Sequence, residues 1–135
     1  MNLEALKISL NKHEGRKNKL YRDTEGHLTG GVGHNFDQPL PEVLIDLILD
    51  FDISVAVEEL DRVFPSWRTH SANRQNVLVE LMFNLGAPTF QKFQKFWYAM
   101  GQNDYETAAD ELLASKWATQ VHGRADTLAA ILRAG

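Results

Sequence analysis

Apolar residues recur at helical spacing from the start of the chain. From Leu3 to Leu10 they fall mostly three or four positions apart, which is the spacing of one face of an α-helix. Asn2 can cap such a helix through its side-chain oxygen, and Gly15 is a natural end for it. The pattern therefore predicts a first helix over residues 2–13.

The same periodicity predicts that most of the remaining chain is helical. Capping residues and glycines mark where the helices begin and end, and two prolines precede the longest one. The predicted helices are Glu42 to Asp61, a helix capped by Ser71 and ended by Gly86, Thr89 to Met100, a helix from Asn103 or Asp104 to about Trp117, and Gly123 to Leu132.

Residues 21–36 break this helical pattern. Four of the nine glycines fall within residues 26–33, and Asp23-Thr24-Glu25-Gly26 is typical of a turn. Dense glycine disfavours helix and permits tight turns, so a hairpin or small twisted sheet fits best, with a short strand at residues 27–29. The predicted fold class is α+β, mostly helical, with one small β element near the N-terminus.

Composition indicates a single soluble domain over residues 1–135. The chain is 44% hydrophobic and 24% charged, which supplies a core for one domain and leaves no length for a second. It has no cysteine, which excludes a disulfide scaffold and a cysteine nucleophile. No apolar run approaches the ~20 residues of a membrane span. The N-terminus shows no basic stretch followed by an apolar segment, so we expect no signal peptide and synthesis in the cytoplasm.

The net charge of -4 is unevenly distributed along the chain. Residues 37–61 carry eight acids and no base, whereas the segments on either side each carry a small excess of bases. The excess of acids belongs to this one connecting segment, so the overall charge does not exclude an anionic polymer as a partner.

Two carboxylates and a hydroxyl are the candidates for chemistry. Glu14 stands where the first helix ends, and there the negative end of the helix dipole would disfavour ionisation, which suits a general acid. Asp23 lies in the following turn, and Thr29 in the predicted strand. A hairpin folding back on the helix end would place all three around one groove. Glycosidic cleavage needs such a carboxylate pair, although a Glu at a helix end and an Asp in a turn are also common surface residues.

Other chemical motifs fail on their spacing. His13-Glu14 does not continue to a zinc-peptidase motif because Lys17 stands where the second histidine is needed. Gly31-Val32-Gly33 lacks the third glycine of a dinucleotide-binding turn. We therefore expect no cofactor and no metal. The five histidines, which lack the tight spacing of metal ligands, are His13, His27, His34, His70 and His122.

The segment that begins at Glu14 resembles the active-site segment of the T-even phage type lysozymes, glycoside hydrolase family 24. From Asp23 to His34 it reads D-T-E-G-x-x-T-x-G-x-G-H, and the spacings of nine and six residues between Glu14, Asp23 and Thr29 match the family. The likeness resumes in three later blocks and so covers most of the chain: Met82 to Gly86, Ala108-Ala109, and Ser115 to Trp117.

The resemblance implies a lysozyme-like architecture. A small N-terminal lobe with a short sheet would cover residues 14–41, a connecting helix residues 42–62, and a helical lobe residues 66–135 together with the helix at 2–13. Only four residues separate His34 from Pro39, where the larger phage enzymes carry a longer β excursion, so the small lobe is expected to be trimmed. Gly30 replaces the family's usual apolar residue, which predicts a more flexible strand.

The resemblance also implies an activity. The family cleaves the β-1,4 bond between N-acetylmuramic acid and N-acetylglucosamine in bacterial peptidoglycan, with inversion. Glu14 would be the general acid, and Asp23 and Thr29 would hold the attacking water. A phage or prophage endolysin of this kind would be a monomer whose partner is peptidoglycan, with no nucleic acid and no stable membrane insertion. Without a signal peptide it would act on the wall after holin-type release.

Five further residues have roles that only the resemblance implies. Asn35, Phe83 and Asn84 would bind substrate, and Asn84 is shorter than the family's frequent Gln. His34 and Arg124 would be supporting residues. The family's histidine is structural, so we expect a hydrogen-bonded or ion-paired His34. The family's arginine lies beside the catalytic glutamate, although a plain surface ion pair is an alternative for Arg124.

Two other functions remain open at this point. A lytic transglycosylase also uses one glutamate, but it leaves a 1,6-anhydro sugar and has no use for a water-holding pair such as Asp23 and Thr29. A wall-binding module that has lost catalysis is the second alternative.

Overall fold

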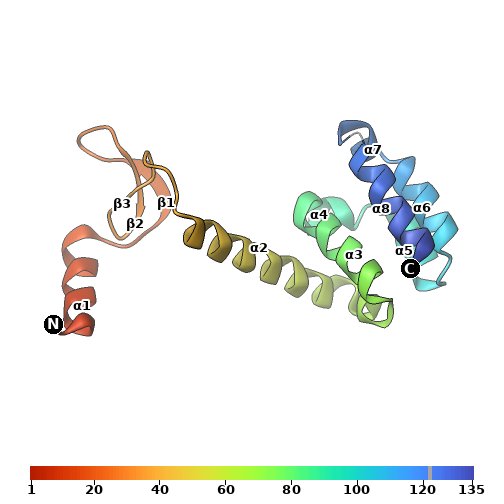
Figure 1. Cartoon of the computed structure of the whole chain (residues 1–135), viewed down its shortest axis with the longest axis horizontal. Helices are drawn as coiled ribbons and strands as arrows, with labels where there is room; N and C mark the ends of the chain where they lie inside the picture. Colours follow the sequence, from red (N-terminus) through yellow and green to blue (C-terminus); the bar gives the residue numbers. More distant parts are fainter. Residues whose placement is uncertain (122) are drawn as a thin grey trace. The chain divides into compact units, whose positions relative to one another are not determined.

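The computed structural model describes residues 1–121 and 123–135, and it divides into two compact units. Unit 1 is Met1–Leu47 and unit 2 is Ile48–Gly135, and each is described by itself (Figure 1). Unit 1 holds helix α1, a small sheet and the beginning of α2, and unit 2 is helical. The division falls inside a long helix, whereas the lobe boundaries expected near residues 41 and 66 stay predictions.

Helix α1, Leu3–Glu14, lies within one residue of the predicted range 2–13 at each end, and Asn2 and Gly15 are its predicted cap and end. The Asn2 Oδ1 accepts a 3.0 Å hydrogen bond from the Ala5 N–H at the first turn. Gly15 ends the helix with a φ of 78°, and its N–H donates to the Asn11 carbonyl. That positive φ is one a glycine adopts without strain, so the chain leaves the helix directly after Glu14.

A three-stranded antiparallel sheet follows α1 in the order β1-β2-β3. Its strands are β1 (Lys17–Arg22), β2 (Leu28–Gly31) and β3 (His34–Asn35). Thr29 occupies the middle strand, where it pairs with Tyr21 on one side and with Asn35 on the other. The hairpin predicted around residues 26–33 is confirmed. Strand β1 was not predicted, because its residues are almost all exposed and show no apolar alternation.

Gly30 is buried in this sheet, and its neighbours fill the room that a side chain would need. A Cβ placed on Gly30 would lie 2.7 Å from a methyl carbon of Leu20 and 3.2 Å from the Phe36 ring. The larger residue usual in the family would therefore clash here unless Leu20 moved. Leu20 and Phe36 therefore pack against the glycine, whereas the expected flexibility of the strand stays a prediction.

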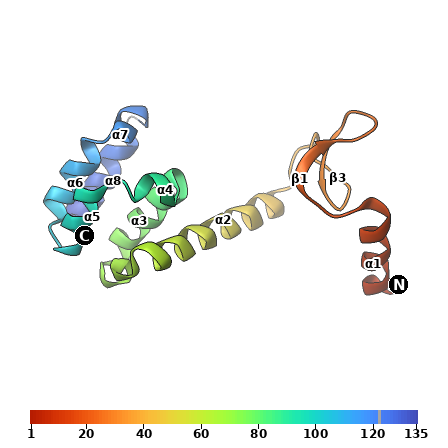
Figure 2. The ribbon, with the colours of Figure 1, turned by 180° about the vertical axis from the view of Figure 1, so that it is seen from behind.

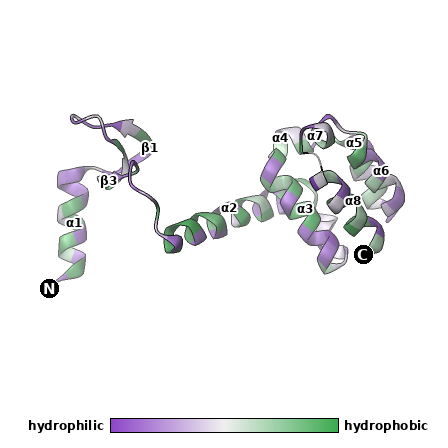
Figure 3. Ribbon diagram, turned by 45° about the horizontal axis from the view of Figure 1, so that its top comes forward, coloured by the Kyte–Doolittle hydropathy of each residue, from purple (hydrophilic) through white to green (hydrophobic). Residues whose placement is uncertain are grey.

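Helix α2, Glu42–Val63, is the long helix predicted from Glu42 to Asp61. Apolar side chains lie exposed along α1 and the first half of α2, where Figure 3 shows green segments. Burial along α2 begins at Ala56 and Leu60. The hydrophobic core therefore lies in unit 2. In the part of the chain that the structure describes, no helix has both the length and the apolar character to cross a bilayer.

Unit 2 packs short helices around an apolar centre. Its largest fully buried side chains include Leu60, Leu78, Phe90 and Phe96. Helices α6 and α8 lie side by side in Figures 1 and 2, α5 packs on α6, and α3 packs on α8. After α2 the elements are η1 (Pro65–Thr69), α3 (Ala72–Leu85), α4 (Ala87–Phe90), α5 (Gln94–Gly101), α6 (Tyr105–Leu113), α7 (Lys116–Gln120) and α8 (Gly123–Ala134).

Helix α3 begins after its predicted cap, since the Ser71 side chain accepts from the Arg74 N–H, and it ends at Gly86. Two other predicted helices are broken in the structure. The helix predicted from Thr89 to Met100 is divided into α4 and α5 by a turn at residues 91–93. The helix predicted to reach Trp117 stops at Leu113, because Ser115 leaves helical geometry and caps α7 through the Ala118 N–H.

Candidate active site

Glu14 is the last residue of α1, and its carboxyl lies against the turn between β2 and β3. A Cβ placed on Gly33 would be 2.9 Å from the Glu14 Oε2 and 3.2 Å from its carboxyl carbon. Gly33 also has a φ of +68°, which a side chain would strain. Because position 33 carries only hydrogen, the Glu14 carboxyl can lie close to the turn that follows β2, the strand that carries Thr29.

Asp23 lies in the turn between β1 and β2, and the turn's own main chain holds it. The Asp23 Oδ1 accepts hydrogen bonds from the N–H groups of Glu25, at 2.9 Å, and His27, at 2.8 Å. The Asp23 N–H in turn donates to the His27 carbonyl. Its pKa is below the usual value, mainly because the His27 N–H bonds to the ionised form. Asp23 is therefore a carboxylate at neutral pH, with Oδ1 committed to the turn.

Thr29 is buried, with 5% of its surface exposed. Its Oγ1 donates a 2.9 Å hydrogen bond to the His27 carbonyl. A hydroxyl has one hydrogen and two lone pairs, so a hydroxyl that already donates is left to accept. The Thr29 oxygen is thus prepared to receive a hydrogen from a neighbouring molecule such as water.

The peptide groups of His27 connect the two residues. Its N–H binds the Asp23 carboxylate, and its carbonyl accepts from both the Asp23 N–H and the Thr29 hydroxyl. The His27 side chain adds a contact, since its Nδ1 lies 3.5 Å from the Asp23 Oδ2. Sequence reasoning missed His27 because these bonds are made by main-chain atoms. The one available signal was that an Asp in a turn tends to bond main-chain N–H groups shortly after it.

Asn35 and His34 form strand β3. Asn35 pairs with Thr29 across the sheet, and its Oδ1 accepts a 2.9 Å hydrogen bond from the Asp37 N–H. The His34 ring packs edge to face against Phe36, with 4.7 Å between ring centroids. Among residues 1–121 and 123–135, the His34 imidazole has no hydrogen-bond or ion-pair partner, so the expected polar contact is not found there and the ring packs on Phe36 instead.

The remaining predicted residues belong to unit 2. The Asn84 Oδ1 accepts a hydrogen bond from the indole Nε1 of Trp117, which joins α3 to α7. Phe83 is 45% exposed and lines a hollow of about 520 Å³ together with Arg124. The Arg124 Nε lies 2.9 Å from the Glu80 Oε1 in an ion pair that is partly exposed. The role of Arg124 toward Glu14 stays a prediction, as do the substrate contacts of Phe83 and Asn84.

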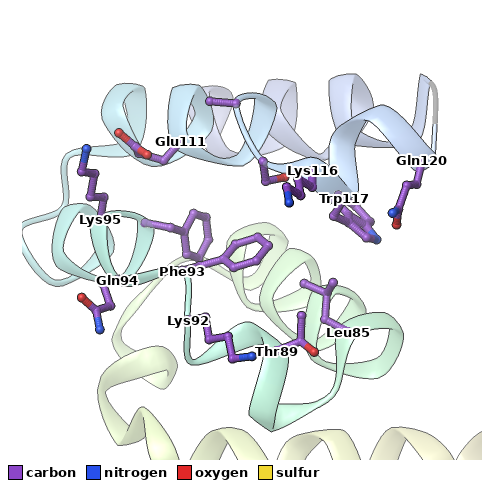
Figure 4. Close-up of a pocket in the computed structure, with 13 residues that line it drawn as sticks. Leu85, Thr89, Lys92, Phe93, Gln94, Lys95, Glu111, Lys116, Trp117 and Gln120 are labelled. Atoms are coloured by element: carbon purple, nitrogen blue, oxygen red, sulfur yellow. The ribbon is translucent and has the colours of Figure 1, made fainter.

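A larger hollow of about 630 Å³ in unit 2 is shown in Figure 4. Phe93 and Trp117 lie along its apolar wall, and the side chains of Lys92 and Lys116 line it from two different segments. Its single lining carboxylate is Glu111. The hollow therefore lacks the carboxylate pair that glycosidic cleavage needs, and the candidate active site remains the one in unit 1.

Within the described ranges, the structure contains no group of three or more acidic or histidine side chains placed to hold a metal ion. His122, one of the five histidines considered in the sequence, lies outside the described residues.

Comparison with known proteins gives consistent matches over nearly the whole chain. The family model "Phage lysozyme" matches residues 11–133. A probable T4-type lysozyme 2 of Dictyostelium discoideum is 26% identical, over 98% of this chain and 96% of that protein. A second protein of that organism, probable T4-type lysozyme 1, is 21% identical with the same coverage. The pre-baseplate central spike protein Gp5 of Enterobacteria phage T4 is 28% identical over 93% of this chain, which corresponds to 27% of the spike protein.

Proposed function

The chain belongs to the phage lysozyme family, and we propose that Glu14, Asp23 and Thr29 carry out its reaction. Membership makes it a lysozyme-type peptidoglycan hydrolase, which is a glycoside hydrolase. The proposed reaction is hydrolysis of the β-1,4 bond between N-acetylmuramic acid and N-acetylglucosamine, with inversion at the anomeric carbon. The observation that carries the proposal is the set of hydrogen bonds through which the His27 main chain joins Asp23 to Thr29.

Glu14 is the proposed general acid. Its carboxyl gives a proton to the glycosidic oxygen as the bond to the anomeric carbon breaks, so that the leaving sugar departs as an alcohol. The bare backbone of Gly33 supports this role, because it lets the carboxyl stand at the edge of the sheet without a side chain covering it.

Asp23 and Thr29 are proposed to hold the water that attacks from the opposite face. The Thr29 Oγ1 donates to the His27 carbonyl, so its lone pairs accept a hydrogen from that water. Asp23, whose Oδ1 is held by the turn, takes the water's other proton on Oδ2 as the new C–O bond forms. In an inverting enzyme the acid and the base lie about 6.5 to 9.5 Å apart, which leaves room for this water.

Substrate binding is proposed for Asn35, Phe83 and Asn84. The Oδ1 of Asn35 and that of Asn84 already accept hydrogen bonds within the protein. Each side chain therefore offers its NH2 group, which donates to sugar or N-acetyl oxygens. The half-exposed ring of Phe83 offers a face on which a sugar can stack. His34 and Arg124 are proposed as supporting residues.

The proposed biological role is that of an endolysin of a phage or prophage, a monomer that reaches the wall from the cytoplasm after a holin-type lesion. The match to the spike protein offers the alternative that a domain of this kind acts within a larger assembly, because that protein is almost four times as long as the matched region.

The test compares the wild type with Glu14→Gln and with Glu4→Gln as a matched control. Both positions lie on α1 and are exposed, and both changes replace a carboxyl group with an amide of the same size. We expect Glu14→Gln to lose about 10²- to 10⁴-fold of wall-lysing activity, because a general acid contributes about that much, while Glu4→Gln keeps it. Near-normal lysis by Glu14→Gln would overturn the assignment.

Product analysis separates the alternative reactions. Mass spectrometry of digested peptidoglycan is expected to show reducing N-acetylmuramic acid ends, and anhydro-sugar products would identify a lytic transglycosylase instead. A catalytically inactive wall-binding module would bind peptidoglycan without clearing it, and Glu14→Gln would then behave like the wild type. Proton NMR of the first product formed tests inversion, since the α-anomer is expected from a β bond.

A further inference from the structure

The carboxylate of Asp37 lies just beyond β3 and bonds to the segment that carries the proposed active site. The Asp37 Oδ2 accepts a 2.9 Å hydrogen bond from the Leu28 N–H, and the Asp37 Oδ1 lies 3.7 Å from the Arg22 Nη1. Leu28 directly precedes Thr29, and Arg22 directly precedes Asp23. One side chain thus holds the neighbours of two proposed catalytic residues.

We propose that Asp37 is a positioning residue for Asp23 and Thr29, an inference that rests on the function proposed above. Asp37 extends the sheet beyond the end of β3. The Leu28 carbonyl accepts from the Phe36 N–H at 2.7 Å, as in a strand pair, and the Leu28 N–H then finds the Asp37 carboxylate in place of a further strand residue. The main-chain N–H and carbonyl of Leu28 are therefore both bonded by the segment that contains Phe36 and Asp37.

The second contact of Asp37 acts on the turn itself. The Arg22 Nη1 that faces Asp37 also donates to the Gly26 carbonyl at 3.2 Å. Gly26 belongs to the turn that places Asp23, since its N–H donates to the Asp23 carbonyl. The carboxylate of Asp37 thereby pairs with the same Arg22 nitrogen that bonds to this turn.

A hydrogen bond from the Asp37 main chain to the Asn35 side chain fixes the backbone from which the Asp37 side chain extends. The Asn35 Oδ1 accepts from the Asp37 N–H at 2.9 Å, which forms a tight turn directly after the strand. An ionised acceptor makes the bond to the Leu28 N–H about twice as strong as a neutral one. Asp37 contacts no atom of the three proposed catalytic side chains in these bonds, so its effect on them passes through the main chain.

The experiment measures kcat and KM on soluble peptidoglycan for the wild type, Asp37→Ala, Asp37→Asn and the control Asp50→Ala. Asp50 is an exposed acid on α2, so its change matches the charge lost at position 37. Because a misplacement of 1 Å can cost about 10²-fold in rate, we expect Asp37→Ala to lower kcat by about 10- to 100-fold with KM within about twofold. Asp37→Asn keeps an oxygen for the Leu28 N–H but loses the ion pair with Arg22, so it is expected to restore part of kcat.

Two readouts separate positioning from a general loss of structure. Amide hydrogen exchange at Leu28 is expected to speed up at least tenfold in Asp37→Ala and to stay near the wild-type rate in Asp37→Asn. The acid limb of the kcat against pH profile is expected to move to higher pH in Asp37→Ala, because a looser turn weakens the His27 N–H bond to Asp23.

Several outcomes would overturn the proposal. They are an unchanged kcat for Asp37→Ala, an unchanged Leu28 exchange rate, or a loss of kcat that Asp37→Asn does not restore. Glu14→Gln, measured alongside, keeps the two proposals apart. If Glu14→Gln is inactive while Asp37→Ala equals the wild type, only the positioning role fails, whereas an active Glu14→Gln defeats the proposed function itself.

Discussion

A methyl group at position 33 is expected to disturb Glu14 directly, and Gly31 provides a matched control. Both glycines have a positive φ, +68° at Gly33 and +59° at Gly31, so alanine is strained at either position. The new Cβ at position 33 would be 2.9 Å from the Glu14 Oε2, whereas at position 31 it would meet nothing within 4 Å. The two variants thus share the backbone cost and differ in the contact with Glu14.

The expected magnitudes follow from that difference. Left-handed backbone costs about 1 to 2 kcal/mol for alanine, so both variants should lose about that much stability. In a chain of this size that corresponds to a melting temperature lower by roughly 3 to 6 °C. To restore ordinary contact, Glu14 must move by about 0.5 to 1 Å, and a displacement of that order costs up to about 10²-fold in rate. Gly33→Ala is therefore expected to lyse walls at least tenfold more slowly than Gly31→Ala.

The assay pairs thermal unfolding followed by circular dichroism with the rate at which a suspension of bacterial walls clears. Activity is compared well below both melting temperatures, so that each variant is folded. Equal activities of Gly33→Ala and Gly31→Ala would refute the reasoning, because they would mean that the position of the Glu14 carboxyl does not limit the reaction. Unequal stabilities would show that the contact with Glu14 also strains the fold.

Two further predictions concern unit 2. Burial, with a smaller contribution from the nearby Arg74, lowers the pKa of His70 from 6.5, and the His70 Nδ1 lies 3.0 Å from the Tyr105 hydroxyl oxygen. As the pH falls, the unfolded chain therefore binds a proton at a higher pH than the folded chain does. The free energy of unfolding should then decrease as the pH drops through about 6.5. Urea titrations at pH 8 and pH 5 measure this decrease, which should be smaller in His70→Gln. Phe90 is fully buried, and Phe90→Ala should cost about 3 to 5 kcal/mol in the same titrations; a loss below about 1 kcal/mol would contradict its place in the core.

Much of the fold was predictable because helix ends carry local signals. Asn2 and Ser71 cap helices through their own side chains, and Gly15 and Gly86 end them with a positive φ, so a short stretch of sequence determines each boundary. Strand β1 was missed because its stability comes from main-chain pairing with β2, which leaves no hydrophobic periodicity to detect.

In the candidate site, too, the features set by neighbouring residues were predictable, and the features set by the packing of distant residues were not. The spacing of Glu14, Asp23 and Thr29 is visible in the sequence. The role proposed for Asp37 is not visible there, because its bond to Leu28 spans nine residues and depends on how the strands pair. Gly30 is another case of spatial information. The sequence shows only that a side chain is absent at this position, whereas the structure shows that Leu20 and Phe36 fill the space that a side chain would take.

The bonds that His27 makes to Asp23 and Thr29 have a consequence for how this segment can vary. They use an N–H and a carbonyl that all residues except proline possess, so the side chain at position 27 is not needed for them. Its imidazole nevertheless lies near the Asp23 Oδ2. Position 27 is thus a place where evolution or a protein engineer can change the charge beside the proposed base, and so tune the working pH, without dismantling the turn.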